Sequence, residues 1–345
     1  MKHPQWHLIK AVQLLAPMIN PVARPNVRSR TRSEAKKADR DQAAPWFRAN
    51  NVVGIVVGRK ITSGSPGDLC LKFMVRRKLS KARLSEADLI PEIWKTASIA
   101  QEIPTDVEVC EEPVITRGGP VVSPSSAAGA IVRPVAPGAS IGHPFEGGGT
   151  IGLVVRRDGV DHYLSCAHVL APGGAGSVQV GDDEEQPADL NAAYPANVVA
   201  NLADFTHVAG EALDFAVARC NAVAHTPVVP GIGRPGLILP NAADDFTDST
   251  MVLTMLGATS GLVEGNVDGF GSFSIFYPDL GQSVTVDGLV RFNAATQGGD
   301  SGAAVFVKGS NPLTVAGLYV GSVSPTQSIF FPAKQVFDRM HLALP

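Results

Sequence analysis

Short apolar segments separated by turn residues dominate the chain from Thr150 onward. Two of them, Ile151–Arg156 and Val160–Cys166, flank an Asp-Gly pair at Asp158-Gly159, which favours a tight hairpin turn. The 345 residues include 35 glycines and 26 prolines, a composition that suits a turn-rich β protein better than a helical bundle. Repeated short strands of this kind predict a sandwich or a barrel, so the fold class is mainly β. Further strands are predicted at residues 214–218, 251–256, 283–286, 303–307, 313–320 and 328–331.

One helix is expected to close the chain. Val336, Phe337, Met340 and Leu344 recur at helical spacing behind Pro332. Proline is tolerated in the first turn of a helix, where its missing N–H has no partner in any case. The β region therefore ends in a C-terminal helix.

The first 47 residues are predicted to form a helical, basic arm. Residues 1–20 have the apolar spacing of a short amphipathic helix, interrupted by Lys10, without the pattern of a signal peptide or the length of a membrane span. Residues 21–47 are rich in arginine and lysine. Contact with nucleic acid or an acidic surface is one interpretation, and a solvated, mobile or weakly helical tail is the favoured one. The net charge of −3 gives no other reason to expect nucleic acid as a partner.

Residues 48–115 are predicted to form a small α/β domain with a role in regulation, docking or assembly. Val52–Val57 is a strand candidate, residues 69–75 alternate between apolar and polar side chains, and residues 103–109 form a third strand candidate. No spacing in this region is typical of a catalytic site.

Residues 116–148 are dominated by Gly, Pro, Ser and Ala, which predicts a linker and leaves 149–345 as a second domain.

Four widely spaced cysteines contain no CxxC pair, which favours buried thiols in a reducing compartment. They are Cys70, Cys110, Cys166 and Cys220. His162, Cys166 and His168 share one strand face as metal ligands would, but no fourth ligand is evident, so no metal is expected. The acidic run Asp182–Glu185 lacks the ligand spacing of a calcium loop and is interpreted as a solvated turn.

A candidate nucleophile lies in Gln297–Gly302, ahead of the apolar run Ala303–Val307. A serine such as Ser301 attacks only when a base removes its proton and fixed donors stabilise the resulting negative charge. Glycines around it let the backbone turn tightly and point amide groups inward. Alone, Gly-Asp-Ser-Gly is a modest signal, because small turn-forming residues recur in ordinary surface loops.

A base and an acid precede this serine. His168 follows the apolar strand Tyr163–Cys166, and Asp214 begins an apolar strand, where a carboxylate must be hydrogen-bonded or paired. The N–H of a histidine would satisfy that carboxylate and fix the tautomer needed for base catalysis. Asp204 competes for the acid role, but no apolar strand follows it.

Three motifs in this order resemble the trypsin/chymotrypsin-like serine peptidases: Ser165–His168, Leu213–Val217 and Gly298–Gly302. The same triad occurs in other orders on other folds, so the order is part of the resemblance. The resemblance covers about residues 149–345. It implies a chymotrypsin-like double β-barrel with a C-terminal helix, preceded here by the small α/β domain.

A narrower resemblance extends to about residues 50–345. Seven segments are similar to bacterial trypsin-like peptidases related to the plant Narrow leaf 1 protein: 51–60, 75–78, 103–107, 138–143, 149–152, 164–170 and 256–265. The group implies a cytoplasmic, self-associating peptidase without a cofactor or membrane segment, whose N-terminal domain is not catalytic. Its partners would be a protein or peptide substrate and further copies of the chain.

The family resemblance implies a role for each matched residue. Ser301 is the nucleophile, His168 is the general base and then the acid, and Asp214 orients His168. The amides of Gly299 and Ser301 form the oxyanion hole. In secreted members of the family, Asp300 pairs with a new N-terminus after cleavage, but this sequence has no convincing cleavage motif, so the partner of Asp300 is open.

Substrate binding is also implied by position. Ala295, six residues before the nucleophile, corresponds to the base of the pocket for the residue preceding the scissile bond. Because Ala295 is not an acid, we do not expect the pocket to require Arg or Lys. We expect it to prefer small or medium apolar side chains. Thr296 borders this position, while Val320 and Gly321 supply the pocket wall and an edge for strand pairing.

Two hypotheses from different classes follow. The first is a serine endopeptidase acting through a Ser-His-Asp triad and an acyl-enzyme, regulated by its N-terminal domain or by assembly. The second is a catalytically silent or conditionally active scaffold that uses the barrel and N-terminal domain to bind partners. The complete trio of His168, Asp214 and Ser301 favours the first.

Overall fold

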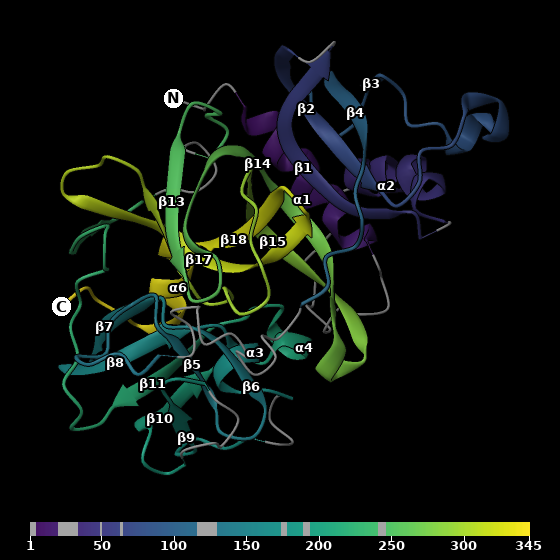
Figure 1. The fold of residues 1–345 in the computed structure, drawn as a ribbon. Coiled ribbons are helices and arrows are strands. Elements are labelled where there is room, and N and C mark those ends of the chain that lie inside the picture. The colour runs from purple at the N-terminus through teal and green to yellow at the C-terminus, as the bar shows by residue number, and fades with distance from the viewer. Residues whose placement is uncertain are drawn as a thin grey trace.

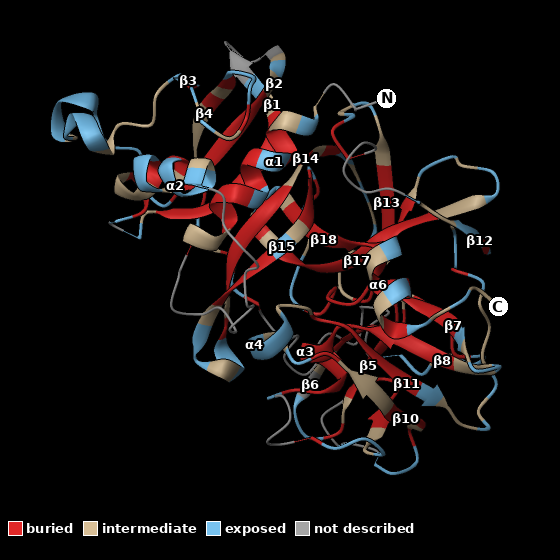
Figure 2. Cartoon of the chain, turned by 180° about the vertical axis from the view of Figure 1, so that it is seen from behind, coloured by how far each residue is buried: buried red, intermediate tan, exposed pale blue. Residues whose placement is uncertain are grey.

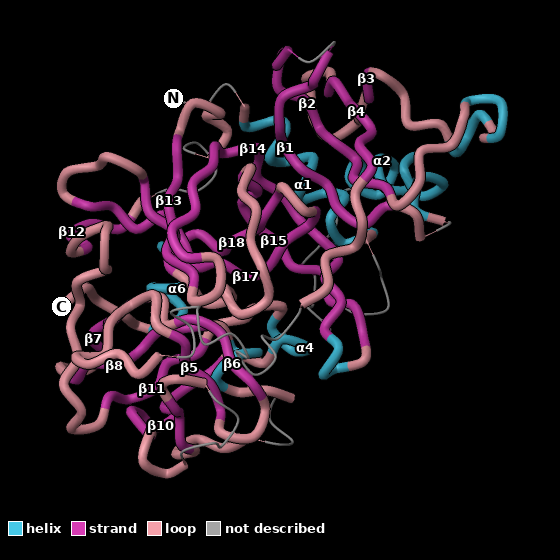
Figure 3. Tube along the Cα trace, in the orientation of Figure 1, coloured by secondary structure: helices cyan, strands magenta, loops and turns pink. Residues whose placement is uncertain are grey.

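Two curled β-sheets, one below the other in Figure 1, carry the fold. The computed structural model describes residues 5–19, 34–48, 50–62, 65–115, 130–173, 178–188, 194–240 and 246–345. The prediction of a mainly β fold that ends in a helix is confirmed. Figure 3 shows that loops join most of the strands and that helices gather chiefly beside the N-terminal strands.

The first sheet has seven strands in the order β6-β5-β9-β10-β11-β8-β7. The β7–β8 hairpin turns at Asp158 and Gly159, both with positive φ (50° and 77°), as its Asp-Gly pair predicted. This sheet begins inside the range predicted to be a linker, because β5 pairs with both β6 and β9. Its elements are β5 (Ser140–His143), β6 (Gly147–Thr150), β7 (Leu153–Arg157), β8 (Val160–Ser165), α3 (Ala167–Leu170), β9 (Asp183–Glu185), β10 (Val198–Phe205), α4 (Val208–Glu211) and β11 (Ala216–Cys220).

The second sheet contains a closed barrel. Strands β13-β16-β17-β18-β15-β14 pair in that order, and pairing of β13 with β14 closes the ring. Pro332 is the N-cap of the C-terminal helix α6. The elements are β12 (Pro235–Ile238), which pairs with β17, β13 (Val252–Gly257), β14 (Gly261–Tyr277), β15 (Gln282–Phe292), β16 (Ala304–Val307), β17 (Leu313–Ser324), β18 (Gln327–Pro332) and α6 (Ala333–Met340).

N-terminal strands extend this second sheet. Strand β1 pairs with β14, and the order continues β1-β2-β4-β3, so the strands of the predicted small α/β domain belong to the same sheet as the barrel. The elements are α1 (Trp6–Leu15), α2 (Glu34–Phe47), β1 (Val52–Thr62), β2 (Ser65–Val75), β3 (Ile93–Trp94) and β4 (Ile103–Val109). Short 3₁₀ turns occur at Ala16–Met18, Lys81–Arg83, Glu86–Asp88 and Pro278–Leu280.

The helices of the N-terminal segment pack on these strands. The amphipathic helix predicted near the N-terminus is α1, which buries Leu8, Val12 and Leu15. Residues 34–47 form the helix α2, as predicted for the helical arm, but α2 is packed rather than solvated, because it buries Ala43, Trp46 and Phe47. The basic residues of 20–33 lie outside the described residues. Figure 2 shows that buried residues follow the strands of both sheets, while much of α2 is exposed.

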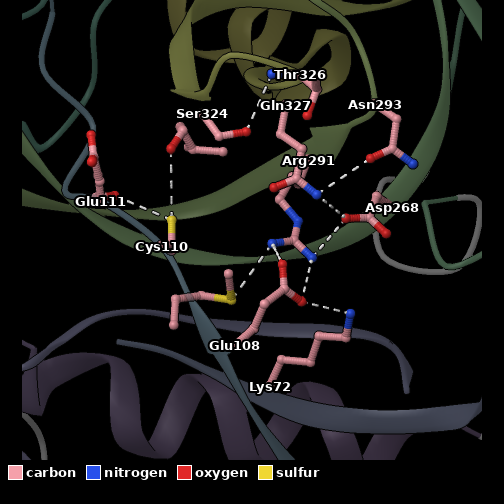
Figure 4. A network of polar contacts seen from close by, with 12 residues as sticks. Lys72, Glu108, Cys110, Glu111, Asp268, Arg291, Asn293, Ser324, Thr326 and Gln327 are labelled. Atoms are coloured by element: carbon pink, nitrogen blue, oxygen red, sulfur yellow. Dashed lines mark hydrogen bonds and ion pairs between the residues drawn. The ribbon is translucent and has the colours of Figure 1, made fainter. Parts of the chain in front are cut away.

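A buried ionic network joins the N-terminal strands to the barrel (Figure 4). Arg291 of β15 is fully buried and pairs with Glu108 of β4 at 2.8 Å and Asp268 of β14 at 2.6 Å. Lys72 of β2 donates to the same Glu108 at 2.9 Å. Burial raises the pKa of Glu108, but Arg291 and Lys72 outweigh burial and hold that pKa below its ordinary value.

No helix among the described residues is long and apolar enough to cross a membrane.

Candidate active site

The predicted catalytic histidine lies at the start of the short helix α3. Strand β8 leads into Cys166, which is the N-cap of α3 with an extended backbone. The backbone N–H of His168 donates to Oδ1 of Asp214 at 2.9 Å, and its ring Nδ1 lies 2.7 Å from Oδ2 of the same carboxylate. Because an ionised carboxylate only accepts hydrogen bonds, Nδ1 carries the proton and Nε2 of the neutral ring keeps its lone pair.

Asp214 is positioned by a hydroxyl from the connection between β10 and β11. Thr206 Oγ1 accepts from the N–H of Phe215 at 2.9 Å and donates to the carbonyl of Leu213 at 2.8 Å. These bonds fix both neighbours of Asp214, whose own side chain is fully buried. The two bonds from His168 satisfy a carboxylate that would otherwise be costly to bury. The sequence interpretation missed Thr206, because no local pattern distinguishes it from other threonines.

Ser301 lies in a tight turn before β16. Gly299 and Gly302 have φ values of 97° and 89°, a region that glycine adopts readily. A side chain on Gly302 would also collide with the hydroxyl of Ser165. The N–H of Thr150 donates to the carbonyl of Ser301 at 2.8 Å. The turn is therefore packed against the end of the first sheet.

Shared contacts place this turn beside the histidine segment. The N–H of Gly302 donates to the carbonyl of Tyr319 at 2.9 Å, and Sγ of Cys166 lies 3.2 Å from the same oxygen. Since Gly302 follows Ser301 and Cys166 precedes His168 by two residues, the candidate nucleophile and the candidate base come from adjoining segments.

The serine and the histidine are not hydrogen-bonded to each other. The Ser301 hydroxyl donates to the carbonyl of Val320 at 2.9 Å. Nε2 of His168 is buried and has no hydrogen-bond partner within the described part of the chain. Ser301 is 5% exposed and His168 is 4% exposed. The geometry therefore fixes one ring nitrogen of His168 on Asp214 and leaves the other without a partner among the described residues.

Asp300 has backbone partners that leave no need for a free N-terminus. Its Oδ1 accepts from the N–H groups of Thr259 and Ser260 at 3.0 and 2.9 Å, and its Oδ2 accepts from the N–H of Gln297 at 2.8 Å. Thr259 also donates through its hydroxyl to the carbonyl of Gly298 at 2.9 Å. The turn between β13 and β14 thus holds the serine loop, which answers the question of what Asp300 pairs with.

The predicted oxyanion donors are uncommitted. Within the described residues, the backbone N–H groups of Gly299 and Ser301 donate no hydrogen bond. The carbonyl of Gly299 accepts from the hydroxyl of Thr150 at 2.8 Å. Two amides without partners next to the nucleophile are available to a developing negative charge.

The predicted substrate-binding residues fall into two groups. Val320 and Gly321 are buried in β17, whereas Ala295 is exposed rather than enclosed. The hydroxyl of Thr296 is bonded to those of Tyr319 and Ser328 at 2.6 and 2.8 Å. The sequence interpretation did not identify the two latter hydroxyls, because they come from strands that were assigned by apolar pattern.

The structure bears on two alternatives that the sequence raised, Asp204 as the acid and a metal site at His162, Cys166 and His168. Asp204 pairs with Arg157 at 2.8 Å, away from His168. His162 contacts the carbonyl of Val160 through Nδ1. The ligand atoms of Cys166, His168 and Asp214 lie within 4.8 Å of one another, but the His168 ring nitrogen nearest Asp214 already shares its proton with that carboxylate. This set therefore fits a catalytic pair better than a metal centre.

The acidic run Asp182–Glu185 is not the predicted solvated turn. Glu184 and Glu185 are fully buried in β9. Burial, reinforced by the nearby Asp182 and Asp183, raises the pKa of Glu184 well above its ordinary value. The Glu184 carboxyl therefore stays protonated to higher pH than a surface glutamate.

All four cysteines are free thiols, and three of them are buried. Burial raises the pKa of Cys70 and Cys110 to about 11 and that of Cys220 to about 12. Such thiols are largely protonated at neutral pH and therefore poor nucleophiles. The prediction of buried thiols is confirmed for Cys70, Cys110 and Cys166, whereas Cys220 is half-buried.

Solved structures similar to this chain are serine proteases. Protease A of Thermobifida fusca is 18% identical with a TM-score of 0.44, covering 61% of this chain and 97% of its own. Chymotrypsin of Cellulomonas bogoriensis is 19% identical with a TM-score of 0.43, covering 61% and 98%. A serine protease described as specific for glutamic acid is 17% identical with a TM-score of 0.45, covering 61% and 100%. At these identities the likeness concerns the fold alone.

No profile of a known protein family and no curated protein sequence matches this chain.

Proposed function

We propose that this chain is a serine endopeptidase that cleaves peptide bonds through His168, Asp214 and Ser301. The observation that carries the proposal is the buried His168–Asp214 pair, 2.7 Å apart, on a segment that contacts the Ser301 turn through Cys166. A buried imidazole with one nitrogen fixed by a carboxylate and the other open is arranged to accept a proton.

The mechanism begins with a change of partner. The Ser301 hydroxyl leaves the carbonyl of Val320 and donates to Nε2 of His168. His168 takes the hydroxyl proton as Ser301 Oγ bonds to the scissile carbonyl carbon, and Asp214 stabilises the charged ring. The amides of Gly299 and Ser301 bind the oxyanion. His168 then protonates the leaving amine, and water releases the acyl group from Ser301 by the same steps in reverse.

The substrate would pair with β17 as an added strand. Beyond Leu318, β17 pairs with β18 but no longer with β16, so within the described residues the Val320–Val323 edge has no strand partner on that side, where a peptide backbone would pair. The preference for small or medium apolar side chains stays a prediction, as do self-association, a reducing compartment and the relation to Narrow leaf 1-like peptidases.

We further propose that the segment after β4 restrains this edge. Ile115 Cδ1 lies 3.2 Å from the point where a Cβ on Gly321 would be. Cys110 Sγ lies 3.9 Å from the carbonyl of Val323. The segment itself is fixed to β14, since the N–H of Ile115 donates to the carbonyl of Phe276 at 3.0 Å. Release of this segment would free the strand edge, which supports control by the N-terminal segment.

The scaffold hypothesis has one observation in its favour, the Ser301–Val320 hydrogen bond, because it leaves the triad incomplete. Labelling with a fluorophosphonate probe decides between the two. The peptidase proposal expects wild type to be labelled on Ser301 and the Ser301→Ala variant to remain unlabelled. Equal labelling of both proteins, or none in wild type, favours the scaffold.

A further inference from the structure

The peptide group between Gly298 and Gly299 carries the first of the two proposed oxyanion amides. A trans peptide group is planar, with its C=O and N–H pointing in opposite directions, so the direction of the Gly298 carbonyl sets that of the Gly299 N–H. Gly299 has a φ of 97°, and neither glycine has a Cβ to restrict rotation of this peptide. Contacts from other residues therefore have to set the direction of the amide.

The carbonyl of Gly298 is held by a side chain from another part of the barrel. The hydroxyl of Thr259, in the turn between β13 and β14, donates to this carbonyl at 2.9 Å. The bond directs the Gly299 N–H away from Thr259, and within the described residues that N–H donates to no other group. The second oxyanion peptide is held inside the serine loop instead, because the N–H of Ala303 donates to the carbonyl of Asp300 at 3.0 Å.

The turn that carries Thr259 is itself fixed to the serine loop. The N–H of Thr259 donates to Oδ1 of Asp300 at 3.0 Å, and the N–H of Ala258 donates to the hydroxyl of Thr150 at 3.0 Å. The same Thr150 hydroxyl donates to the carbonyl of Gly299 at 2.8 Å. The peptide groups on both sides of Gly299 are thus hydrogen-bonded to threonine hydroxyls, which together fix its φ and ψ.

We infer that Thr259 is a positioning residue of the oxyanion hole, whose hydroxyl holds the Gly298–Gly299 peptide so that the N–H of Gly299 is available to the substrate. The kinetic consequences of this inference rest on the proposed peptidase function. Its structural content, control of one peptide group by one hydroxyl, is independent of that function.

The test compares Thr259→Val and Thr259→Ser in the full-length protein. Valine has the shape of threonine without the hydroxyl, and serine keeps the hydroxyl. Thr259 is only half-buried, so neither change opens a cavity in the core. Thr314→Val is the matched control, because the Thr314 hydroxyl also donates to a backbone carbonyl, that of Pro312 at 3.1 Å, but lies at the opposite end of the β16–β17 pair from the serine loop.

Two readouts are taken. The first is the pair of NMR resonances that report the peptide group, the carbonyl ¹³C of Gly298 and the amide ¹⁵N of Gly299. The second is kcat and KM for peptide hydrolysis. Thr259→Val should move both resonances and lower kcat about 3- to 10-fold with little change in KM, as expected for loss of one neutral hydrogen bond that matters in the transition state. Thr259→Ser should restore both readouts, and Thr314→Val should change neither.

Unmoved resonances in Thr259→Val overturn the inference whether or not the protein hydrolyses peptides. Moved resonances with an unchanged kcat, or a Thr259→Ser variant that behaves like Thr259→Val, also overturn it. Resonances that move in Thr259→Val and return in Thr259→Ser, in a protein whose wild type cleaves nothing, support control of the peptide group and reject the peptidase. The two proposals therefore fail separately.

Discussion

The hydroxyl of Ser301 donates its hydrogen bond to the carbonyl of Val320, 2.9 Å away. Val320 belongs to the strand edge on which a peptide substrate would lie, and the histidine that should receive this bond has a vacant Nε2. The proposed reaction requires the serine hydroxyl to exchange this acceptor for Nε2 of His168. This relationship makes the site testable residue by residue.

The acid of the triad is the first test. Asp214→Asn should reduce kcat/KM for peptide hydrolysis by about 10⁴, because an amide favours the wrong tautomer of His168. Asp204→Asn is the control, since Asp204 pairs with Arg157 instead and its loss should leave kcat/KM unchanged. Comparable losses in both variants would contradict the assignment of Asp214.

The anchor of the serine loop is the second test. A Cβ on Gly257 would collide with the carboxylate of Asp300, which is held by three backbone amides. Gly257→Ala should therefore displace the loop that carries the oxyanion amides and lower kcat by about 10²- to 10³-fold. Gly210→Ala meets only an ordinary contact at 3.7 Å and should retain full kcat. Retention of kcat by Gly257→Ala would show that Asp300 does not hold the site.

The segment after β4 is the third test. Ile115 is 3% exposed and packs on Gly321, whereas the adjacent Val114 is 45% exposed. Ile115→Ala should raise kcat/KM for peptides by about fivefold or more, a typical coupling between sites, because the strand edge is less restrained. Val114→Ala should not. A fall or no change in kcat/KM for Ile115→Ala rejects restraint by this segment.

The buried carboxyl of Glu184 is the fourth test and concerns stability. Because burial raises its pKa in the folded protein, the native state binds this proton more tightly than the unfolded state, and the free energy of unfolding falls as pH rises above about 4.3. Glu184→Gln removes that dependence. Urea unfolding should show a flatter pH profile for the variant, and its free energy of unfolding should fall less than that of wild type between pH 5 and neutral pH. Parallel profiles would contradict the buried, protonated state.

Much of the fold was predictable because each strand carries its own apolar pattern. The β7–β8 hairpin and α6 lie where local sequence placed them. Strand β14 was missed because glycines interrupt its pattern. At Gly265 and Gly271, a Cβ would collide with the backbones of Asn293 and Ile55, so these glycines permit close strand approach. The need for glycine at these positions follows from strand pairing that is seen only in the folded structure.

The residues of the candidate site also include some that sequence could predict and some that it could not. His168, Asp214 and Ser301 stand in short motifs with recognisable neighbours, so sequence could propose them. Thr206 acts through hydrogen bonds to the backbone of both neighbours of Asp214, and it carries no local signature. Contacts of that kind follow from packing alone.

The most direct measurement is hydrolysis of a diverse peptide library by wild type and Ser301→Ala, with products identified by mass spectrometry. Wild type should cleave the library at defined bonds and release peptides with new amino termini. The Ser301→Ala variant should release none of these peptides above background. Its thermal unfolding midpoint should equal that of wild type, which shows that it is folded. Identical product sets from the two proteins, or no cleavage by either wild type or the Ile115→Ala variant, would contradict a peptidase that uses Ser301 as its nucleophile.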